Sequence, residues 1–396
     1  MKNILYITTR LPYPLIGGDR MHIYNYLKQL KKLGNKITLV SLVNDDDDIE
    51  GIKEHTEFYD KLITVKYNKK FCYLKSVKAI FTGRPFISEY YYEPKMQKII
   101  NDEVKTGQYD VVLGYIYRTL PYIKNLKNIK KVLHMCDAFS MMYYRRMMVK
   151  KSLWEKFKIF IEYVRVKKAE RDCFKYTDKQ VVIGHEDLKH LSKFGDTKNA
   201  TVIGLATDTE YYKPIESELS NSMCFVGAMW YIPNWQAAVY FGKEVFPLIK
   251  KEFPDAKFKV IGAEPKPELI EIAKSQEGFE VLGRVEDVRE HMKDCKVSVC
   301  PTQIAGGIQN KILEAMSMGI PVVTTPEGFE GIGADKTILR VAKNPEEYAQ
   351  KVIEIMKNPK LREDISVKSR EYILKNFSWE KIGEQWENVI SEVVGE

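Results

Sequence analysis

The chain has 396 residues, of which 44% are hydrophobic and 29% charged, a composition typical of a soluble globular protein with more than one core. No apolar run approaches the ~18 residues that a membrane-spanning helix needs, and the first apolar stretch is too short to predict a signal peptide. The six cysteines show no C-x-x-C spacing, which disfavours a zinc site and favours free thiols in a cytoplasmic protein.

The net charge of +8 is unevenly distributed. Residues 1–200 carry 38 Lys and Arg against 23 Asp and Glu, a charge of +15, and the remaining 24 and 31 give −7. A basic first half favours an anionic membrane surface, an anionic lipid carrier or nucleic acid as a partner. No nucleic-acid-binding motif accompanies the charge, so we expect no nucleic acid partner.

The first half alternates short apolar strands with helices. The first strand is followed by Pro12, Pro14 and Gly17-Gly18, and then by a helix with an apolar inner face. The run Asp45–Asp48 after the second strand could mimic a metal-binding cluster, but we interpret it as a solvated loop. The alternation predicts a parallel sheet covered on both faces. Its expected strands are Asn3–Thr8, Lys36–Val43, Val111–Gly114, Lys131–Met135, Gln180–Ile183 and Thr201–Ile203.

The pattern restarts after a polar segment at residues 204–220, which we interpret as a linker. The expected strands of this second doubly wound unit are Met223–Val226, Lys257–Ile261, Phe279–Leu282, Val297–Cys300 and Val322–Thr324. We therefore predict an α/β protein with Rossmann-like domains over residues 1–206 and 207–376 that face each other across a cleft. Residues 377–396, with Ser378 as an N-cap, predict a helix that returns to the first domain.

The most informative segment runs from Gly306 to Val323. Its glycines open a predicted helix, on which Gly307, Asn310, Lys311 and Glu314 form one polar line. Backbone N–H groups and one cation suit a nucleotide diphosphate, and a carboxylate suits a ribose diol. An ordinary amphipathic helix with an exposed Lys–Glu pair is the alternative.

The common nucleotide and hydrolase motifs are missing from the sequence. No G-x-G-x-x-G follows the first strand, and no P-loop, G-x-S-x-G or H-E-x-x-H occurs. A nicotinamide dehydrogenase and a P-loop ATPase are therefore disfavoured. Glycine-rich turns between strands and helices remain in both halves.

Four collinear segments together resemble the family 4 glycosyltransferases of the GT-B fold, and within them the bacterial enzymes of exopolysaccharide and lipopolysaccharide synthesis. These segments are Arg10–Pro14 with Gly17–Arg20, Phe225–Met229 with Pro233-Asn234, Leu282–Val288, and the signature segment from Gly306. The resemblance implies donor binding by Gly17, Gly18, Arg20, Gly227, Asn234, Arg284, Val285, Gln303, Gly307, Gln309, Asn310, Lys311 and Glu314.

Alternative interpretations stay open for several of these residues. Gly17-Gly18 could form a plain turn, and Arg20 and Arg284 could be surface arginines. Many family members carry a Glu eight residues before the position of Glu314, where this chain has Gly306. The contact with the donor sugar is thus unassigned, with Gln303, Gly307 and Gln309 as candidates.

The catalytic candidates are His134, Asp137 and Lys311. His134-Met135-Cys136-Asp137 follows a predicted strand, and the resemblance implies that this loop faces the reaction centre. His134 would then contact the transferred sugar and Asp137 would orient the acceptor. A core histidine and a helix-capping aspartate are the alternatives.

The implied reaction is displacement of a nucleoside diphosphate from a sugar C1 by an acceptor hydroxyl. Family membership implies retention of configuration, a UDP- or GDP-linked co-substrate, no further cofactor and no metal. The acceptor would be a saccharide or a lipid-linked saccharide. The rival functions are a UDP-sugar 2-epimerase, a phosphorylase and a non-catalytic adaptor at the membrane surface.

Residues 143–171 combine ten Lys and Arg with interleaved aromatic and aliphatic residues. A basic amphipathic helix of this kind can lie on anionic lipid, which would place the protein peripherally on the inner face of the plasma membrane. A core-packed helix with a solvated basic face is the alternative.

Overall fold

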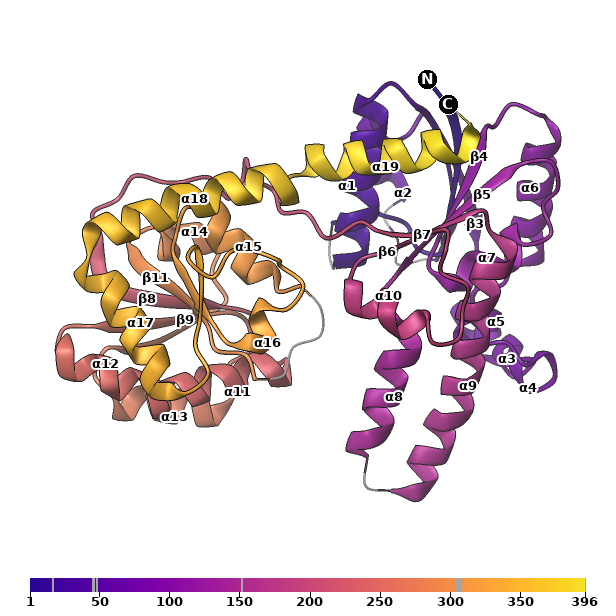
Figure 1. Cartoon of the computed structure of the whole chain (residues 1–396). Coiled ribbons are helices and arrows are strands. Elements are labelled where there is room, and N and C mark those ends of the chain that lie inside the picture. Colours follow the sequence, from indigo (N-terminus) through magenta and orange to yellow (C-terminus); the bar gives the residue numbers. More distant parts are fainter. Residues whose placement is uncertain (16–17, 45–46, 48, 151, 304–307, 396) are drawn as a thin grey trace. The chain divides into compact units, whose positions relative to one another are not determined.

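The structure is a computed structural model that describes residues 1–15, 18–44, 47, 49–150, 152–303 and 308–395. The chain divides into two compact units, one formed by Met1–Gly204 with Ile382–Glu396 and the other by Leu205–Lys381. Each unit is built on one parallel sheet with helices packed on both faces (Figure 1). The predicted α/β class with two Rossmann-like sheets is therefore confirmed.

The described residues of the first unit form a seven-stranded sheet whose strands are β1 (Asn3–Thr8), β2 (Lys36–Val43), β3 (Lys61–Lys66), β4 (Val111–Tyr115), β5 (Lys130–Cys136), β6 (Lys179–Val182) and β7 (Ala200–Val202). They lie in the order β3-β2-β1-β4-β5-β6-β7, and every neighbouring pair is parallel. The sequence pattern missed β3, an edge strand.

The helices around this sheet are α1 (Gly18–Lys32), α2 (Ile49–Lys53), α3 (Lys69–Ser76), α4 (Ala79–Thr82), α5 (Phe86–Tyr90), α6 (Pro94–Lys105), α7 (Leu120–Ile123), α8 (Phe139–Val149), α9 (Leu153–Tyr176) and α10 (His185–Leu191), with 3-10 turns η1 (Thr56–Phe58) and η2 (Tyr117–Thr119). Helices α8 and α9 form an antiparallel pair that projects from the sheet (Figure 1).

The second unit repeats the architecture with strands β8 (Ser220–Val226), β9 (Lys257–Ile261), β10 (Phe279–Gly283), β11 (Cys295–Cys300), β12 (Val322–Thr324) and β13 (Leu339–Val341). The described strands are parallel and lie in the order β10-β9-β8-β11-β12-β13. The helical elements are α11 (Ile232–Tyr240), the π-helical turn η3 (Phe241–Val245), α12 (Phe246–Glu252), α13 (Pro267–Ser275), α14 (Val288–Met292), α15 (Asn310–Ser317), α16 (Pro326–Phe329), α17 (Pro345–Lys357) and α18 (Pro359–Phe377).

Local sequence signals explain several helix ends. Asn344 and Asn358 accept hydrogen bonds from the N–H groups of Glu347 and Leu361, and each precedes a proline at the first helical position of α17 or α18. Helix α15 is followed by Gly319, whose φ of 71° lets the chain turn back toward β12.

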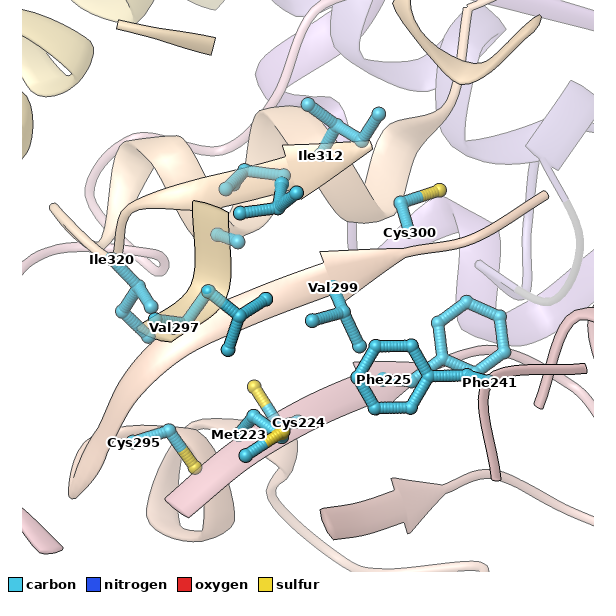
Figure 2. Close-up of a cluster of buried hydrophobic side chains, with 14 of the residues drawn as sticks. Met223, Cys224, Phe225, Phe241, Cys295, Val297, Val299, Cys300, Ile312 and Ile320 are labelled. Atoms are coloured by element: carbon cyan, nitrogen blue, oxygen red, sulfur yellow. The ribbon is translucent and has the colours of Figure 1, made fainter. Parts of the chain in front are cut away.

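The core of the second unit lies between its sheet and its helices. Side chains of β8 and β11, including Phe225, Val297 and Val299, pack with Phe241 and with Ile312 of α15 (Figure 2). All five side chains have at most 1% of their surface exposed. This packing attaches α15 to the sheet and so positions its polar face.

The last helix, α19 (Trp379–Val394), returns to the first unit as expected. Ser378 accepts the N–H of Lys381 at 3.2 Å and caps the helix. Glu387 binds the ammonium of Lys2 at 2.6 Å, and its other oxygen accepts from the Asn35 side chain at 2.6 Å. The end of the chain is therefore tied to the start of the first sheet.

The segment expected to be a linker is held against the second unit. The carbonyl oxygen of Tyr212 accepts hydrogen bonds from Ser317 Oγ at 2.7 Å and from the Arg370 guanidinium at 3.0 Å. Residues 205–219 thus belong structurally to the unit that they precede.

Candidate functional site

The crevice of the second sheet is defined by its strand order. From β8 the chain moves outward to β9 and β10 and then crosses to β11 on the other side of β8. The connections after β8 and β11 therefore diverge, and open α/β sheets bind ligands at such a switch point, beyond the carboxyl ends of the strands. Gly227 follows β8, and Gln303 and α15 follow β11.

Lys311 extends from the first turn of α15 to this switch point. Its ammonium donates to Asn234 Oδ1 and to Gln309 Oε1, each at 3.1 Å, and lies 5.7 Å from the centre of the Phe225 ring. Asn234 is buried and donates in turn to the carbonyl oxygen of Ala228 at 3.1 Å. Within the described residues both hydrogen-bond partners of the ammonium are neutral amides, so these bonds position its positive charge without neutralising it.

Glu314 lies one turn further along α15. Burial raises the pKa of its carboxyl group to about 7, although the Lys311 ammonium and the Tyr212 side chain lower it. The carboxyl group is thus poised between its neutral and ionised forms near neutral pH. The sequence analysis missed Tyr212, because it falls in the segment interpreted as a linker.

The glycines after β8 and β9 allow two backbone segments to approach closely. An added Cβ at Gly262 would lie 1.8 Å from the carbonyl oxygen of Gly227, and one at Gly227 would lie 2.7 Å from Asn234 Nδ2. Backbone hydrogen bonds from Gly227 to Ile261 and from Gly262 to Gly283 join the carboxyl ends of β8, β9 and β10. The backbone that carries Asn234 is therefore fixed by its neighbours.

The glycines predicted to open the signature helix lie outside the described residues. Helix α15 begins at Asn310, with Gln309 as its N-cap residue. Asn310 and Gln303 are exposed, and Gly307 is not described. The donor-binding roles of these residues stay predictions.

Two further donor candidates follow β10. Arg284 is exposed and Val285 is half-buried, at the carboxyl edge of the same sheet. The sequence analysis also missed two exposed aromatic residues, Trp230 and Tyr231, which follow β8 and precede Asn234. An aromatic pair a few residues after a strand-ending glycine was the signal that could have found them.

Of the donor-binding candidates at the start of the first unit, Arg20 is held by an ion pair. Gly18 begins α1, and Gly17 lies outside the described residues. Arg20 donates to Asp47 at 2.8 Å, with only 12% of the arginine side chain and 4% of the aspartate side chain exposed. Arg20 is therefore not a surface arginine. The expected solvated loop is wrong for Asp47, while Asp45, Asp46 and Asp48 are not described.

His134 lies inside β5, in agreement with the strand predicted at Lys131–Met135 and not in the loop that follows it. The rings of Tyr26, Tyr115 and Trp386 surround it, with centroids 5.2, 5.3 and 5.0 Å away. Within the described residues neither ring nitrogen has a hydrogen-bond partner. Burial, and then the nearby His22, lower its pKa to about 3, so the ring is neutral at physiological pH. Its predicted contact with the sugar stays a prediction.

Asp137 follows the strained end of β5. Cys136 before it has a φ of 61°, and Ile116 after the adjacent strand β4 has a φ of 64°, values that non-glycine residues adopt at an energetic cost. The surrounding protein, and then the Asp187 carboxylate, raise the pKa of Asp137 to about 6. A strained backbone and a carboxyl group with a raised pKa lie together at the carboxyl ends of β4 and β5. This combination indicates a functional position.

Asp137 does not cap the helix that follows it. Asp187 accepts the N–H of Ala138 at 2.8 Å, and Glu170 accepts that of Ser140 at 3.1 Å, so carboxylates from α10 and α9 satisfy the start of α8. The helix-capping alternative is therefore wrong. Asp137 itself is exposed.

Residues 143–171 lie in α8 and α9, and the core-packed alternative holds for Val166, which is fully buried, but not for several other apolar residues. The buried residues of α9 are Glu162, Val166, Glu170 and Cys173. Its exposed residues include the apolar side chains of Leu153, Trp154, Phe157, Phe160 and Val164. Apolar and basic side chains thus share the solvent-facing surface of this helix.

All six cysteines are free and buried. Among the described residues, no three His, Cys, Asp or Glu side chains are grouped as metal ligands. The described helices also include none with the length and apolar character needed to cross a bilayer.

Comparisons with known proteins identify the second unit. Residues 220–358 match the family model described as Glycosyl transferases group 1. A protein of Klebsiella pneumoniae, described as an uncharacterized 44.6 kDa protein in the cps region, is 23% identical over 96% of this chain and 98% of its own length. An uncharacterized glycosyltransferase of Methanocaldococcus jannaschii is 23% identical over 72% of this chain and 73% of its own.

Solved structures share the fold of the whole chain. Sucrose-phosphate synthase from Thermosynechococcus elongatus matches with a TM-score of 0.69 at 12% identity, over 100% of both chains. Anabaena HepE, solved in complex with UDP and glucose, matches with a TM-score of 0.67 at 11% identity, over 99% of this chain and 100% of its own.

Proposed function

We propose, on the premise that this chain is a glycosyltransferase of the GT-B type with a group 1 domain over residues 220–358, that it transfers a sugar from a UDP- or GDP-linked donor to a saccharide or lipid-linked saccharide. The observation that carries the proposal is the Lys311 ammonium, held by Asn234 and Gln309 at the switch point of the second sheet. A UDP complex of a structural neighbour supports a nucleotide donor.

The chemistry follows from where charge develops. When an acceptor hydroxyl displaces the nucleoside diphosphate from the sugar C1, negative charge builds on the leaving phosphates while the sugar becomes oxocarbenium-like. A preorganised ammonium stabilises that charge without reorganisation at the moment of reaction. We assign this role to Lys311, hydroxyl binding to Glu314, and orientation of the acceptor to Asp137. Retention of configuration is part of the proposal.

The proposal also includes a biological role and a position in the cell. A relative in a cps region supports a role in surface polysaccharide synthesis. The exposed apolar and basic side chains of residues 143–171 support a peripheral position at an anionic membrane surface inside the cell. The proposed reaction uses no cofactor besides the nucleotide-linked sugar.

A thermal-shift panel of UDP, GDP, ADP and CDP tests the donor. A ligand that binds only the folded protein raises the melting temperature, and we expect UDP or GDP to do so alone. The responding nucleotide-sugar is then followed by NMR, with and without candidate acceptors. Transfer that requires an acceptor supports the proposal. Conversion of the donor to an epimer without any acceptor, or no response to any nucleotide, contradicts it.

A further inference from the structure

A small exposed lobe of the first unit carries apolar side chains that the sequence analysis did not single out. It consists of α3, α4 and the residues between them. Phe81 has 87% of its surface exposed, and large fractions are also exposed for Phe71, Tyr73, Leu74, Val77 and Ile80. Lys70, Lys75 and Lys78 lie among them. Several exposed apolar side chains gathered on one short segment mark a docking site.

The segment that follows this lobe contacts α9. The backbone N–H of Phe86, at the start of α5, donates to Glu162 of α9 at 2.8 Å, and the Arg165 guanidinium lies 4.7 Å from the centre of the Phe86 ring. Thr82, at the end of α4, lines a cavity together with Arg165 and Lys168 of α9. The end of α4 and the start of α5 are therefore held against α9.

A basic cavity of about 130 Å³ lies between these elements. Four of its lining residues are the cations Arg84, Lys124, Arg165 and Lys168, and Asp172 is the one acidic lining residue. Arg84 and Arg165 pair with Glu89 and Glu162, at 3.3 and 3.7 Å. A volume several times the ~30 Å³ share of one water has room for a phosphate group.

Two of the four cations carry unneutralised charge. Within the described residues Lys124 and Lys168 form no ion pair, and the Lys124 ammonium lies 5.9 Å from the centre of the Tyr176 ring. Thr82 and Ser88 also line the cavity, and the Thr82 hydroxyl donates to Glu89 at 2.9 Å. The cavity is therefore suited to an anion, because two of its positive charges are not paired with a carboxylate. Phosphate oxygens can accept hydrogen bonds from these cations.

We propose that this cavity binds the phosphate of an anionic membrane lipid while the apolar side chains of α3, α4 and α9 contact the acyl region around it. A lipid is favoured over nucleic acid because aliphatic side chains such as Leu74, Val77 and Ile80 contribute nothing to binding a hydrated polyanion. Basic groups and apolar side chains together are what an interfacial surface requires. The inference extends the membrane proposal above and involves no step of sugar transfer.

Vesicle co-sedimentation tests the proposal with the full-length protein. We expect binding to phosphatidylcholine vesicles that contain phosphatidylglycerol, and much weaker binding to phosphatidylcholine alone. The double variant Lys124→Gln/Lys168→Gln should bind the anionic vesicles roughly tenfold more weakly, because each basic group near an anionic surface contributes to attraction. A second double variant, Ile80→Ser/Phe81→Ser, should lose affinity for the same vesicles without losing charge.

Matched controls separate this site from general electrostatics and from the proposed function. Lys98→Gln/Lys105→Gln removes the same charge from exposed positions on α6 and should leave vesicle binding nearly unchanged. Melting temperatures of all variants, and their response to the nucleotide that stabilises the wild-type protein, should be unaltered. That response depends on the second unit, so its absence in the wild-type protein would count against the transferase proposal alone.

Several outcomes would overturn the lipid assignment. One is equal binding of the lysine variant and the wild-type protein to anionic vesicles. Another is stabilisation by inorganic phosphate or glycerol 3-phosphate without any vesicle binding, which would identify a soluble ligand. Tight binding of a single-stranded RNA that the lysine variant loses, or a dimer in sedimentation velocity that Ile80→Ser/Phe81→Ser dissociates, would assign the surface to another partner.

Discussion

The ammonium of Lys311 donates a hydrogen bond of 3.1 Å to Oδ1 of Asn234, a residue 77 positions earlier in the chain. This bond joins the segment that follows β8 to helix α15, which follows β11. These two segments diverge at the switch point of the sheet. The bond orients a cation over the place where a diphosphate is expected, because a neutral amide holds the ammonium without cancelling its charge.

Replacement of Lys311 by alanine should therefore destabilise the transition state of sugar transfer far more than it destabilises the folded protein. We expect kcat/KM for sugar transfer to fall by about 10²–10³, as when one preorganised donor to a developing anion is removed. Lys351→Ala, in an i,i+4 pair with Glu347 on α17, is the matched control and should change little. Initial rates and melting temperatures distinguish the two, and equal rates for both variants would rule out the proposed role.

Nucleotide binding should depend on pH through Glu314. Its pKa of about 7 means that the carboxyl group is largely neutral below that pH, and only the ionised form accepts two ribose hydroxyls. Affinity for the nucleoside diphosphate should therefore rise as the pH rises through about 7, with proton release on binding. Calorimetry in two buffers of different ionisation enthalpy measures this release. Glu314→Gln should bind more weakly and release no proton from this site.

Gly262 should be intolerant of any side chain. A Cβ there would lie 1.8 Å from the carbonyl oxygen of Gly227, so the connection that carries Asn234 would have to move. We expect Gly262→Ala to lower the free energy of unfolding by about 3 kcal/mol or more. Gly283→Ala is the comparison, because nothing lies near its Cβ and only a φ of 69° opposes alanine, at about 1 kcal/mol. Urea denaturation measures both, and equal losses would contradict the steric account.

The buried carboxyl group of Glu170 should make the protein less stable as pH rises. Burial raises its pKa in the folded state to about 7 from the ordinary 4.5, so the folded protein binds more protons than the unfolded chain between these values. The contribution is fully present below pH 4.5 and is lost as pH rises through 7. Glu170→Gln removes the ionisation and should flatten this part of the curve. Glu155→Gln, at a more exposed position on α9, should not flatten it.

The buried ring of His134 should make the protein less stable as pH falls. Its pKa is lowered from 6.5 to about 3, so the unfolded chain binds the extra proton and stability is lost as pH falls below 6.5. His134→Phe keeps an aromatic ring among Tyr26, Tyr115 and Trp386 and should remove this acid sensitivity. Retained transfer activity in this variant would contradict the predicted contact of the His134 ring nitrogens, which are buried without partners in the described structure, with the sugar. A large loss of kcat with unchanged stability would instead support a direct contact with the sugar.

Much of the fold could be predicted from local patterns in the sequence. The predicted strands Asn3–Thr8, Lys36–Val43 and Lys257–Ile261 coincide with β1, β2 and β9, because strands inside a parallel sheet are buried on both faces and read as continuous apolar runs. The two strands that were missed, β3 and β13, lie at sheet edges. Their half-exposed residues, such as those of Lys61–Lys66, do not give such a run.

By itself the sequence determined the fold class, the family resemblance and the identity of Lys311 and Glu314, because these depend on residue type and short-range spacing. Only the tertiary structure decided which groups surround them. Asn234 reaches Lys311, Asp47 reaches Arg20, and Asp187 and Glu170 rather than Asp137 cap α8. Burial also decided the pKa values of His134 and Glu170. Desolvation and long-range contacts depend on how distant segments pack, which no local pattern encodes.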